Sequence, residues 1–118
     1  MPNECPKTFT EKRPWGEELW ITKNSPSMVK IISVNPGEAL SLQYHNDRDE
    51  YWHILSGDGT ATIGSDLIPL KGGQDCFIPR LTKHRLTGGT ARLVLLELAF
   101  GQFDEKDIVR LEDRYGRA

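Results

Sequence analysis

Four side chains in the middle of the chain carry donor atoms that divalent metal ions prefer: Gln43, His45, Glu50 and His84. Gln43 and His45 are two residues apart in a predicted strand, so both side chains point to the same side of it. Glu50 opens the next predicted strand, and His84 follows a turn bounded by Pro79. If these strands return beside one another, two imidazoles, one carboxylate and one amide oxygen meet at one point. This set suits a borderline divalent ion: zinc, or else cobalt, nickel, manganese or iron.

A structural interpretation of the same residues stays open. A single histidine in a strand is often a packed core residue, and glutamine is an uncommon metal ligand. If a metal is held here, only Glu50 among its ligands is anionic, so the site keeps positive charge. Such a site can polarise a bound carbonyl or hydroxyl oxygen.

The elements that would position these residues are short strands separated by turn signals. The turns include NPG at 35–37, SGDG at 56–59 and KGGQ at 71–74. Between such turns, strands are predicted at residues 28–34, 40–45, 51–55, 60–63, 67–70, 76–78, 85–87 and 91–100. Strands at this spacing predict an all-β fold, and a jelly-roll barrel closes two such sheets on each other. We expect a single domain over residues 1–118, with a barrel core at about 28–100.

The two ends differ from the core in composition. Residues 8–20 contain Trp15 and Trp20, and we expect an N-terminal arm packed across the barrel. Residues 104–111 are rich in charge and predict a short C-terminal helical segment, with Asp104 as its N-cap.

The overall composition excludes several classes of function. The 118 residues have a formal net charge of −2, with 37% apolar and 27% charged residues, which is typical of a globular protein. No basic run or stripe is present, which argues against nucleic-acid binding. The longest apolar run, near 93–96, is too short to span a membrane. The polar N-terminus is unlike a signal peptide, and Cys5 and Cys76 do not form a CxxC pair, so we expect free thiols and a cytoplasmic location.

A first motif resembles one known from the cupin superfamily. Gly37, Gln43, His45, Glu50 and Gly57 have its spacing, with Gln43 in place of its first histidine. The resemblance implies a double-stranded β-helix, the cupin form of the jelly roll, with a metal held by side chains of this motif.

A second motif resembles the other half of the cupin pattern. Gly73, Pro79 and His84 match it. Leu81 stands where a glycine is usual, and Gly88 stands where an asparagine is usual. The resemblance assigns His84 to the metal site.

Longer stretches are similar to one cupin family, the type II phosphomannose isomerases, whose cupin domain usually follows a mannose-1-phosphate guanylyltransferase domain. The similar stretches are RPWG at 13–16, VK at 29–30, PGEALSLQYH at 36–45, RDEYW at 48–52 and DIVRLEDRYGR at 107–117. The resemblance implies metal-dependent interconversion of mannose 6-phosphate and fructose 6-phosphate, with zinc as the metal. No Gly-rich phosphate loop precedes the barrel, so guanylyl transfer is not expected.

The implied reaction needs a general base and groups that bind phosphate. Glu97 is a candidate base if its side chain faces the cavity, whereas an outward Glu97 would be solvated. Lys30 lies in an apolar strand and is either a second candidate base, a phosphate ligand or a solvated lysine. Arg48, beside Glu50, is the first choice for phosphate. Trp52 and Arg110 are further candidates for substrate contact.

Other functions are compatible with the same residues. One is a non-catalytic metal- and sugar-binding cupin that partners a separate guanylyltransferase. Another is a different metal-dependent cupin enzyme, such as a dioxygenase or an epimerase. We expect a small-molecule sugar phosphate as the partner, and we expect the chain to form a homodimer.

Overall fold

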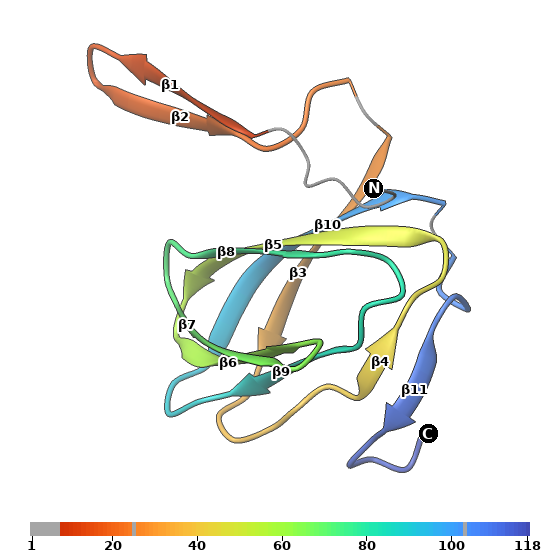
Figure 1. Cartoon of the computed structure of the whole chain (residues 1–118). Helices are drawn as coiled ribbons and strands as arrows, with labels where there is room; N and C mark the ends of the chain where they lie inside the picture. The colour runs from red at the N-terminus through yellow and green to blue at the C-terminus, as the bar shows by residue number, and fades with distance from the viewer. Residues whose placement is uncertain (1–7, 25, 103) are drawn as a thin grey trace.

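The computed structural model describes residues 8–24, 26–102 and 104–118, and the regular secondary structure of these residues is all β (Figure 1). In chain order the strands are β1 (Phe9–Arg13), β2 (Gly16–Trp20), β3 (Ser27–Val34), β4 (Leu42–Tyr44), β5 (Arg48–Ser56), β6 (Asp58–Ile63), β7 (Asp66–Lys71), β8 (Asp75–Ile78), β9 (His84–Gly88), β10 (Leu93–Gly101) and β11 (Val109–Glu112). In these described ranges we find no helix with the length and apolar character needed to cross a lipid bilayer.

Two antiparallel sheets face each other and form the barrel (Figure 1). One sheet has the strand order β3-β10-β5-β8, and the other has the order β11-β4-β9-β6-β7. Pro69 lies in β7, at an edge of its sheet, where the missing N–H removes no ladder hydrogen bond. The predicted double-stranded jelly roll is therefore confirmed.

The core lies between the two sheets and is built by alternation along β5 and β10, although Tyr51 and Leu98 are buried on the opposite face of these strands. In β10, Leu93, Leu95 and Ala99 are buried on the inner face, and Glu97 shares that face. Register places Glu97 opposite Lys30 of β3 on one side and Trp52 of β5 on the other. The same alternation that builds the core thus brings charged side chains into the barrel.

Two departures from the second cupin motif have a structural explanation. Leu81 adopts a left-handed backbone with φ of 69°, the conformation for which the motif uses glycine. Its amide donates to the carbonyl oxygen of His45 at 2.7 Å, which ties this turn to the residue after β4. A side chain at Gly88 would place Cβ 2.2 Å from the carbonyl oxygen of Asn35, so only glycine fits there.

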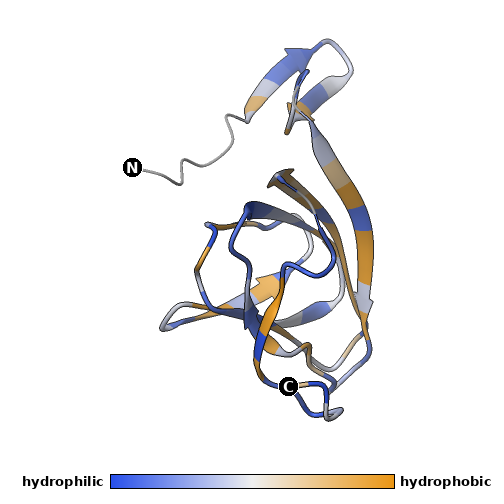
Figure 2. Cartoon of the chain, turned by 90° about the vertical axis from the view of Figure 1, so that its right-hand side faces the viewer, coloured by the Kyte–Doolittle hydropathy of each residue, from blue (hydrophilic) through white to orange (hydrophobic). Residues whose placement is uncertain are grey.

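The expectation that the N-terminal arm packs across the barrel is wrong. Residues 9–20 form the β1–β2 hairpin, which stands away from the barrel (Figures 1 and 2). Trp20 stacks on Phe9 within the hairpin, with ring centroids 5.1 Å apart, and Trp15 at the turn is 72% exposed. Within the hairpin, Lys12 pairs with Glu17 and Arg13 pairs with Glu18, so these charged side chains have partners without contacting the barrel surface.

The predicted helix at 104–111 is also wrong. Asp104 caps a turn instead, because its Oδ1 accepts from the amide of Lys106 at 2.9 Å and its carbonyl accepts from the amide of Asp107 at 2.9 Å. The chain then extends into β11, which pairs with β4. The β-branched residues Ile108 and Val109 favour an extended chain, and the open edge of β4 supplies partners.

Candidate metal centre

Three buried side chains from different strands bring their ligand atoms together. His45 follows β4, Glu50 lies in β5 and His84 begins β9. One ligand atom of each lies within 4.8 Å of the other two. Glu50 lies between the imidazoles, with Oε2 3.1 Å from His45 Nε2 and Oε1 3.7 Å from His84 Nε2. Three of the four donors predicted from spacing therefore form one cluster that can hold a metal ion.

Backbone carbonyl groups hold both imidazoles through Nδ1. His45 Nδ1 lies 2.7 Å from the carbonyl oxygen of Asp107, and His84 Nδ1 lies 2.9 Å from that of Thr82. Because a carbonyl oxygen only accepts, each Nδ1 carries the hydrogen and donates it. His45 Nε2 faces the cluster instead, 3.1 Å from Glu50 Oε2 and 3.2 Å from Arg48 Nη2, so hydrogen on Nδ1 leaves Nε2 as the nitrogen available to a metal. This is the tautomer with which histidine ligates a metal through Nε2.

His84 Nε2 gives a further indication that the cluster suits a cation. Among the residues that the structure describes, this buried nitrogen has no hydrogen-bond partner. Burial lowers the pKa of His84, against the opposing charge of Glu50, so the neutral imidazole is favoured. A buried lone pair that faces a carboxylate oxygen is unfavourable unless a cation or a donor lies between them. The donor set therefore fits a divalent ion with nitrogen and oxygen ligands.

Arg48 is part of the cluster. Its side chain is only 6% exposed, and Nε donates to Glu50 Oε2 at 3.1 Å while Nη1 donates to the carbonyl oxygen of Asp104 at 3.3 Å. Burial opposes ionisation of Glu50, but the hydrogen bond with His45 and the charges of His84, His45 and Arg48 lower its pKa to about 2. Glu50 is therefore a carboxylate at neutral pH, as a metal ligand must be.

Gln43, the fourth predicted donor, lies at the edge of the cluster. Its Nε2 is 3.5 Å from His45 Nε2, and its Oε1 accepts a short hydrogen bond from the hydroxyl of Ser41. Coordination would require the amide to turn so that Oε1 faces the imidazoles. The role of Gln43 as a ligand stays a prediction.

The side chain of Glu97 faces the interior of the barrel, whereas the sequence had left open whether it faces the cavity or the solvent. The residue is 5% exposed and lies in β10 between Lys30 and Trp52. Burial, together with the charge of Glu50, raises the pKa of Glu97 to about 7, although Lys30 and Arg48 act in the opposite direction. Two neighbouring carboxyl groups thus differ widely in proton affinity, an arrangement typical of sites that use one of them to exchange protons.

Glu50 of the cluster, but neither imidazole, lines a cavity of about 290 Å³. Lining residues include five predicted site residues besides Glu50: Lys30, Gln43, Arg48, Glu97 and Arg110. Glu105 and Ile108 of the C-terminal segment complete one wall. Glu105 and Ile108 were not predicted as site residues, because a helix at 104–111 gave no reason to place these residues beside β4.

Trp52 lies beneath the cluster and is 1% exposed. Its Nε1 donates to Glu50 Oε1 at 3.3 Å, and its ring meets that of His84 edge-on with centroids 5.7 Å apart. These contacts orient two of the ligands, while the predicted contact of Trp52 with substrate stays untested.

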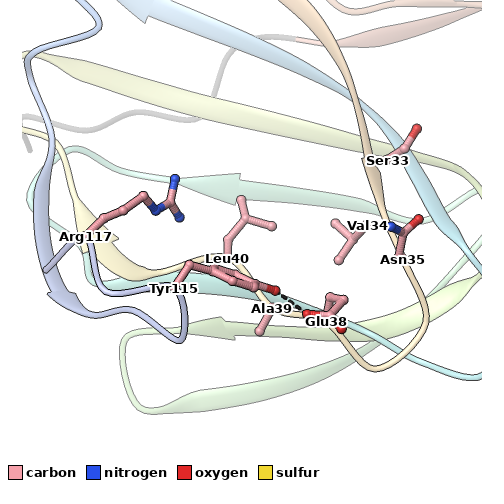
Figure 3. A pocket seen from close by; sticks show the side chains of 8 residues that line it. All are labelled: Ser33, Val34, Asn35, Glu38, Ala39, Leu40, Tyr115 and Arg117. Carbon is pink, nitrogen blue, oxygen red and sulfur yellow. Dashed lines mark hydrogen bonds between the residues drawn. The ribbon is translucent and has the colours of Figure 1, made fainter.

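A second cavity, of about 430 Å³, lies beside the first and shares Leu40 with it (Figure 3). Tyr115 and Arg117 from the end of the chain form one side, and the hydroxyl of Tyr115 donates to Glu38 (Figure 3). Arg117 is paired with Asp113 at 2.9 Å. Of the described residues that line the two cavities, Glu50 in the first belongs to the cluster of His45, Glu50 and His84, and none in the second does.

Comparison with known proteins agrees with this geometry. Residues 3–113 match the family described as mannose-6-phosphate isomerase, C-terminal. The chain belongs to this family. The predicted resemblance is thereby confirmed, and His45, Glu50 and His84 form the buried cluster of such a domain.

Two curated relatives show how the domain occurs elsewhere. Xanthan biosynthesis protein XanB of Xanthomonas campestris pv. campestris is 42% identical over 107 residues, which cover 89% of this chain and 23% of XanB. Mannose-1-phosphate guanylyltransferase ManC of Salmonella typhimurium is 39% identical over 107 residues, covering 89% of this chain and 22% of ManC. The chain thus spans less than a quarter of the length of these relatives.

Solved structures show the same fold. A protein from Acidithiobacillus ferrooxidans, described only provisionally as a sugar phosphate isomerase, superposes with a TM-score of 0.59 at 27% identity, over 66% of this chain and 51% of that one. A cupin protein from Bacteroides fragilis superposes with a TM-score of 0.59 at 22% identity, over 72% and 79% of the two chains. The second likeness supports the cupin fold alone.

Proposed function

We propose that this chain is a metal-dependent isomerase that interconverts mannose 6-phosphate and fructose 6-phosphate. The observation that carries the proposal is the buried cluster of His45, Glu50 and His84, whose Glu50 lines a cavity together with a second buried carboxyl group, Glu97. The family supports a role in sugar-phosphate metabolism. The specific activity, and zinc as the metal, are our inference.

The proposed reaction moves one proton between neighbouring carbons. A proton leaves C2 of the open-chain aldose to form a 1,2-enediol, a proton is added to C1, and the hydroxyl proton passes from O2 to O1. No electrons leave the substrate. A divalent ion held by His45, Glu50 and His84 would polarise the substrate oxygens on C1 and C2.

Glu97 is our candidate for the proton transfer. Its carboxyl group lines the cavity on the strand next to Glu50, so a substrate held at the metal centre would present C1 and C2 to it. Lys30, directly opposite Glu97 in register, is the other candidate base predicted from the sequence. Both side chains line the cavity. The kinetics of a variant at Glu97 and of a variant at Lys30 would show which of the two acts as the base.

Arg110 and Lys30 are the candidates for phosphate binding that the contacts support best. Both line the cavity. Within the described ranges, the buried Nε of Arg110 has no hydrogen-bond partner, which leaves a charged donor for a ligand. Arg48 also lines the cavity, but it donates hydrogen bonds to Glu50 and to the Asp104 carbonyl and contacts His45, so its predicted contact with phosphate stays open.

The experiment that tests the function is an assay of fructose 6-phosphate formed from mannose 6-phosphate by the purified chain. Isomerase activity should disappear when a chelator is added and return when a divalent ion is added back. Comparing the activity recovered with each ion would show which ion the site prefers. His84→Ala should abolish the activity. His53→Ala is the matched control, because His53 pairs with Asp75 outside the cluster. A wild-type protein that binds metal but forms no product under any of these ions would overturn the proposal.

One alternative has an observation in its favour. The chain spans less than a quarter of relatives such as ManC, named as a mannose-1-phosphate guanylyltransferase, so it could serve as a metal- and sugar-binding partner of a separate guanylyltransferase. Calorimetry would then show binding of mannose 6-phosphate without turnover. The homodimer and the cytoplasmic location stay predictions, to be tested by the mass in solution and by fractionation.

A further inference from the structure

Asp107 makes two kinds of contact with the strand end that carries His45, although the residues are 62 positions apart in the chain. Its backbone carbonyl oxygen accepts from His45 Nδ1 at 2.7 Å. Its carboxylate accepts from the amide of Asn46 at 2.8 Å, from Asn46 Nδ2 at 3.2 Å and from the amide of Asp47 at 2.9 Å. Asp107 therefore holds both the imidazole of His45 and the backbone of residues 46 and 47 through hydrogen bonds.

We propose that Asp107 is a positioning residue for His45, and that docking of residues 104–112 against β4 is thereby coupled to metal binding. The inference rests on the proposed function in one respect, namely that His45 is a metal ligand. Asp107 itself touches neither metal nor substrate, since its carboxylate points to the amides of residues 46 and 47.

The carbonyl contact decides which nitrogen of His45 is free. With the hydrogen held on Nδ1, the lone pair is on Nε2, which faces Glu50 at 3.1 Å. The contact also fixes rotation of the ring about its bond to Cβ. A ring without this acceptor divides between two tautomers and several orientations, and only some of them can ligate.

The carboxylate contacts keep that carbonyl in place. The turn around Asp107 is closed by hydrogen bonds from its own amide to the Asp104 carbonyl and from the Ile108 amide to the Lys106 carbonyl, both at 2.9 Å. Among the described residues, the carboxylate makes the hydrogen bonds that join this turn to residues 46 and 47. Arg48 Nη1 on the Asp104 carbonyl and the pairing of β11 with β4 hold the rest of the segment, so loss of the carboxylate should loosen the register of the Asp107 carbonyl with the imidazole. Beyond the turn, Arg110 pairs in register with Gln43 and lines the cavity.

Docking of residues 104–112 against β4 and binding of the metal are coupled by thermodynamic linkage. If docking of the segment favours the ligating form of His45, a bound metal favours docking by the same factor. Outer contacts of this kind typically change metal affinity by about 10- to 100-fold when they are removed.

The second imidazole provides an internal control. His84 donates from Nδ1 to the carbonyl of Thr82, which is two residues away on the same loop. This contact does not involve the C-terminal segment. Loss of Asp107 should therefore affect His45 and leave the tautomer of His84 unchanged.

The test compares Asp107→Ala with wild type and with Asp113→Asn. The control removes a carboxylate that directly follows the segment, binds Arg117 and, in the described part of the chain, makes no hydrogen bond to residues 45–47. The first measurement is the nitrogen-15 chemical shifts of both imidazoles in metal-free protein, at about pH 8, above the ordinary imidazole range. In Asp107→Ala we expect the His45 signals to move from the Nδ1–H pattern toward a tautomer mixture, while those of His84 stay in place.

The second measurement is the affinity for Zn²⁺ alone. We expect Asp107→Ala to weaken the affinity for Zn²⁺ about 10- to 100-fold, and Asp113→Asn to leave it within about twofold, a difference of less than RT. If Asp107→Ala does not fold, Asp107→Asn replaces it: its amide oxygen can still accept from Asn46, whereas its NH₂ cannot accept from Asp47, so an intermediate loss is expected. Unchanged His45 shifts and Zn²⁺ affinity in the folded variant would overturn the inference. Wild-type protein that binds Zn²⁺ without isomerase activity would overturn the proposed function alone.

Discussion

Glu50 and Glu97 face one cavity from neighbouring strands, yet their pKa values are shifted in opposite directions, to about 2 and to about 7. Glu50 lies among His45, His84 and Arg48, which outweigh its burial. Burial dominates for Glu97, and the neighbouring negative charge of Glu50 adds to it. Glu50 therefore stays ionised, whereas Glu97 can hold a proton near neutral pH.

The first prediction concerns the stability of metal-free protein against pH. The folded-state pKa of Glu97 is raised from 4.5 to about 7, so the folded chain binds more protons than the unfolded chain between these values. Stability should therefore fall as pH rises from 4.5 to 7, by about 3 kcal/mol from this group. Glu97→Gln should remove this slope, as measured by denaturant unfolding across the window. An unchanged slope in the variant would contradict the assignment.

The second prediction concerns metal removal. Zn²⁺ at 100 times its Kd should raise the free energy of unfolding by about 2.7 kcal/mol over the chelator-treated protein. The shift in unfolding midpoint should be lost in His45→Ala and His84→Ala, because each removes a ligand nitrogen. It should persist in His53→Ala, whose imidazole pairs with Asp75. A full Zn²⁺ shift in both ligand variants would mean that the ion binds elsewhere.

The third prediction concerns the left-handed turn before His84. Leu81→Gly should stabilise the protein by about 1 kcal/mol, because glycine adopts a positive φ without the steric cost that leucine bears. Leu81 is 60% exposed, so little burial is lost. Leu67→Gly is the matched control: Leu67 is 71% exposed but lies within β7, where glycine should destabilise. Equal effects of the two substitutions on the unfolding midpoint would refute the role of backbone strain.

The fourth prediction concerns phosphate recognition. Arg110→Ala should raise KM for mannose 6-phosphate about 10-fold or more, the usual effect of losing a charged hydrogen bond, and change kcat much less. Arg92→Ala, at an exposed position outside the cavity, should leave both constants unchanged. Weaker inhibition of the Arg110→Ala variant by inorganic phosphate would support the assignment. A loss of kcat with unchanged KM would instead place Arg110 in the chemical step.

Much of the fold was predictable because its signals are local. The alternation along β5 and β10 and the turn residues between strands located β3 to β10, with bounds that differ mainly at the ends. The C-terminal segment was not predictable in this way. Its charge and the capping residue Asp104 suggested a helix, but the unpaired edge of β4 offers backbone partners that no local pattern reveals.

The sequence alone determined which side chains could share a metal site, since Gln43, His45 and Glu50 owe their common direction to strand periodicity and to one short turn. Tertiary structure decided the rest. Only the packing of β10 between β3 and β5 turned Glu97 inward and raised its pKa. Only the pairing of β11 with β4 brought Asp107 to His45. Burial and the tautomer of a ring depend on neighbours that are distant in the chain, and spacing along the chain does not specify those neighbours.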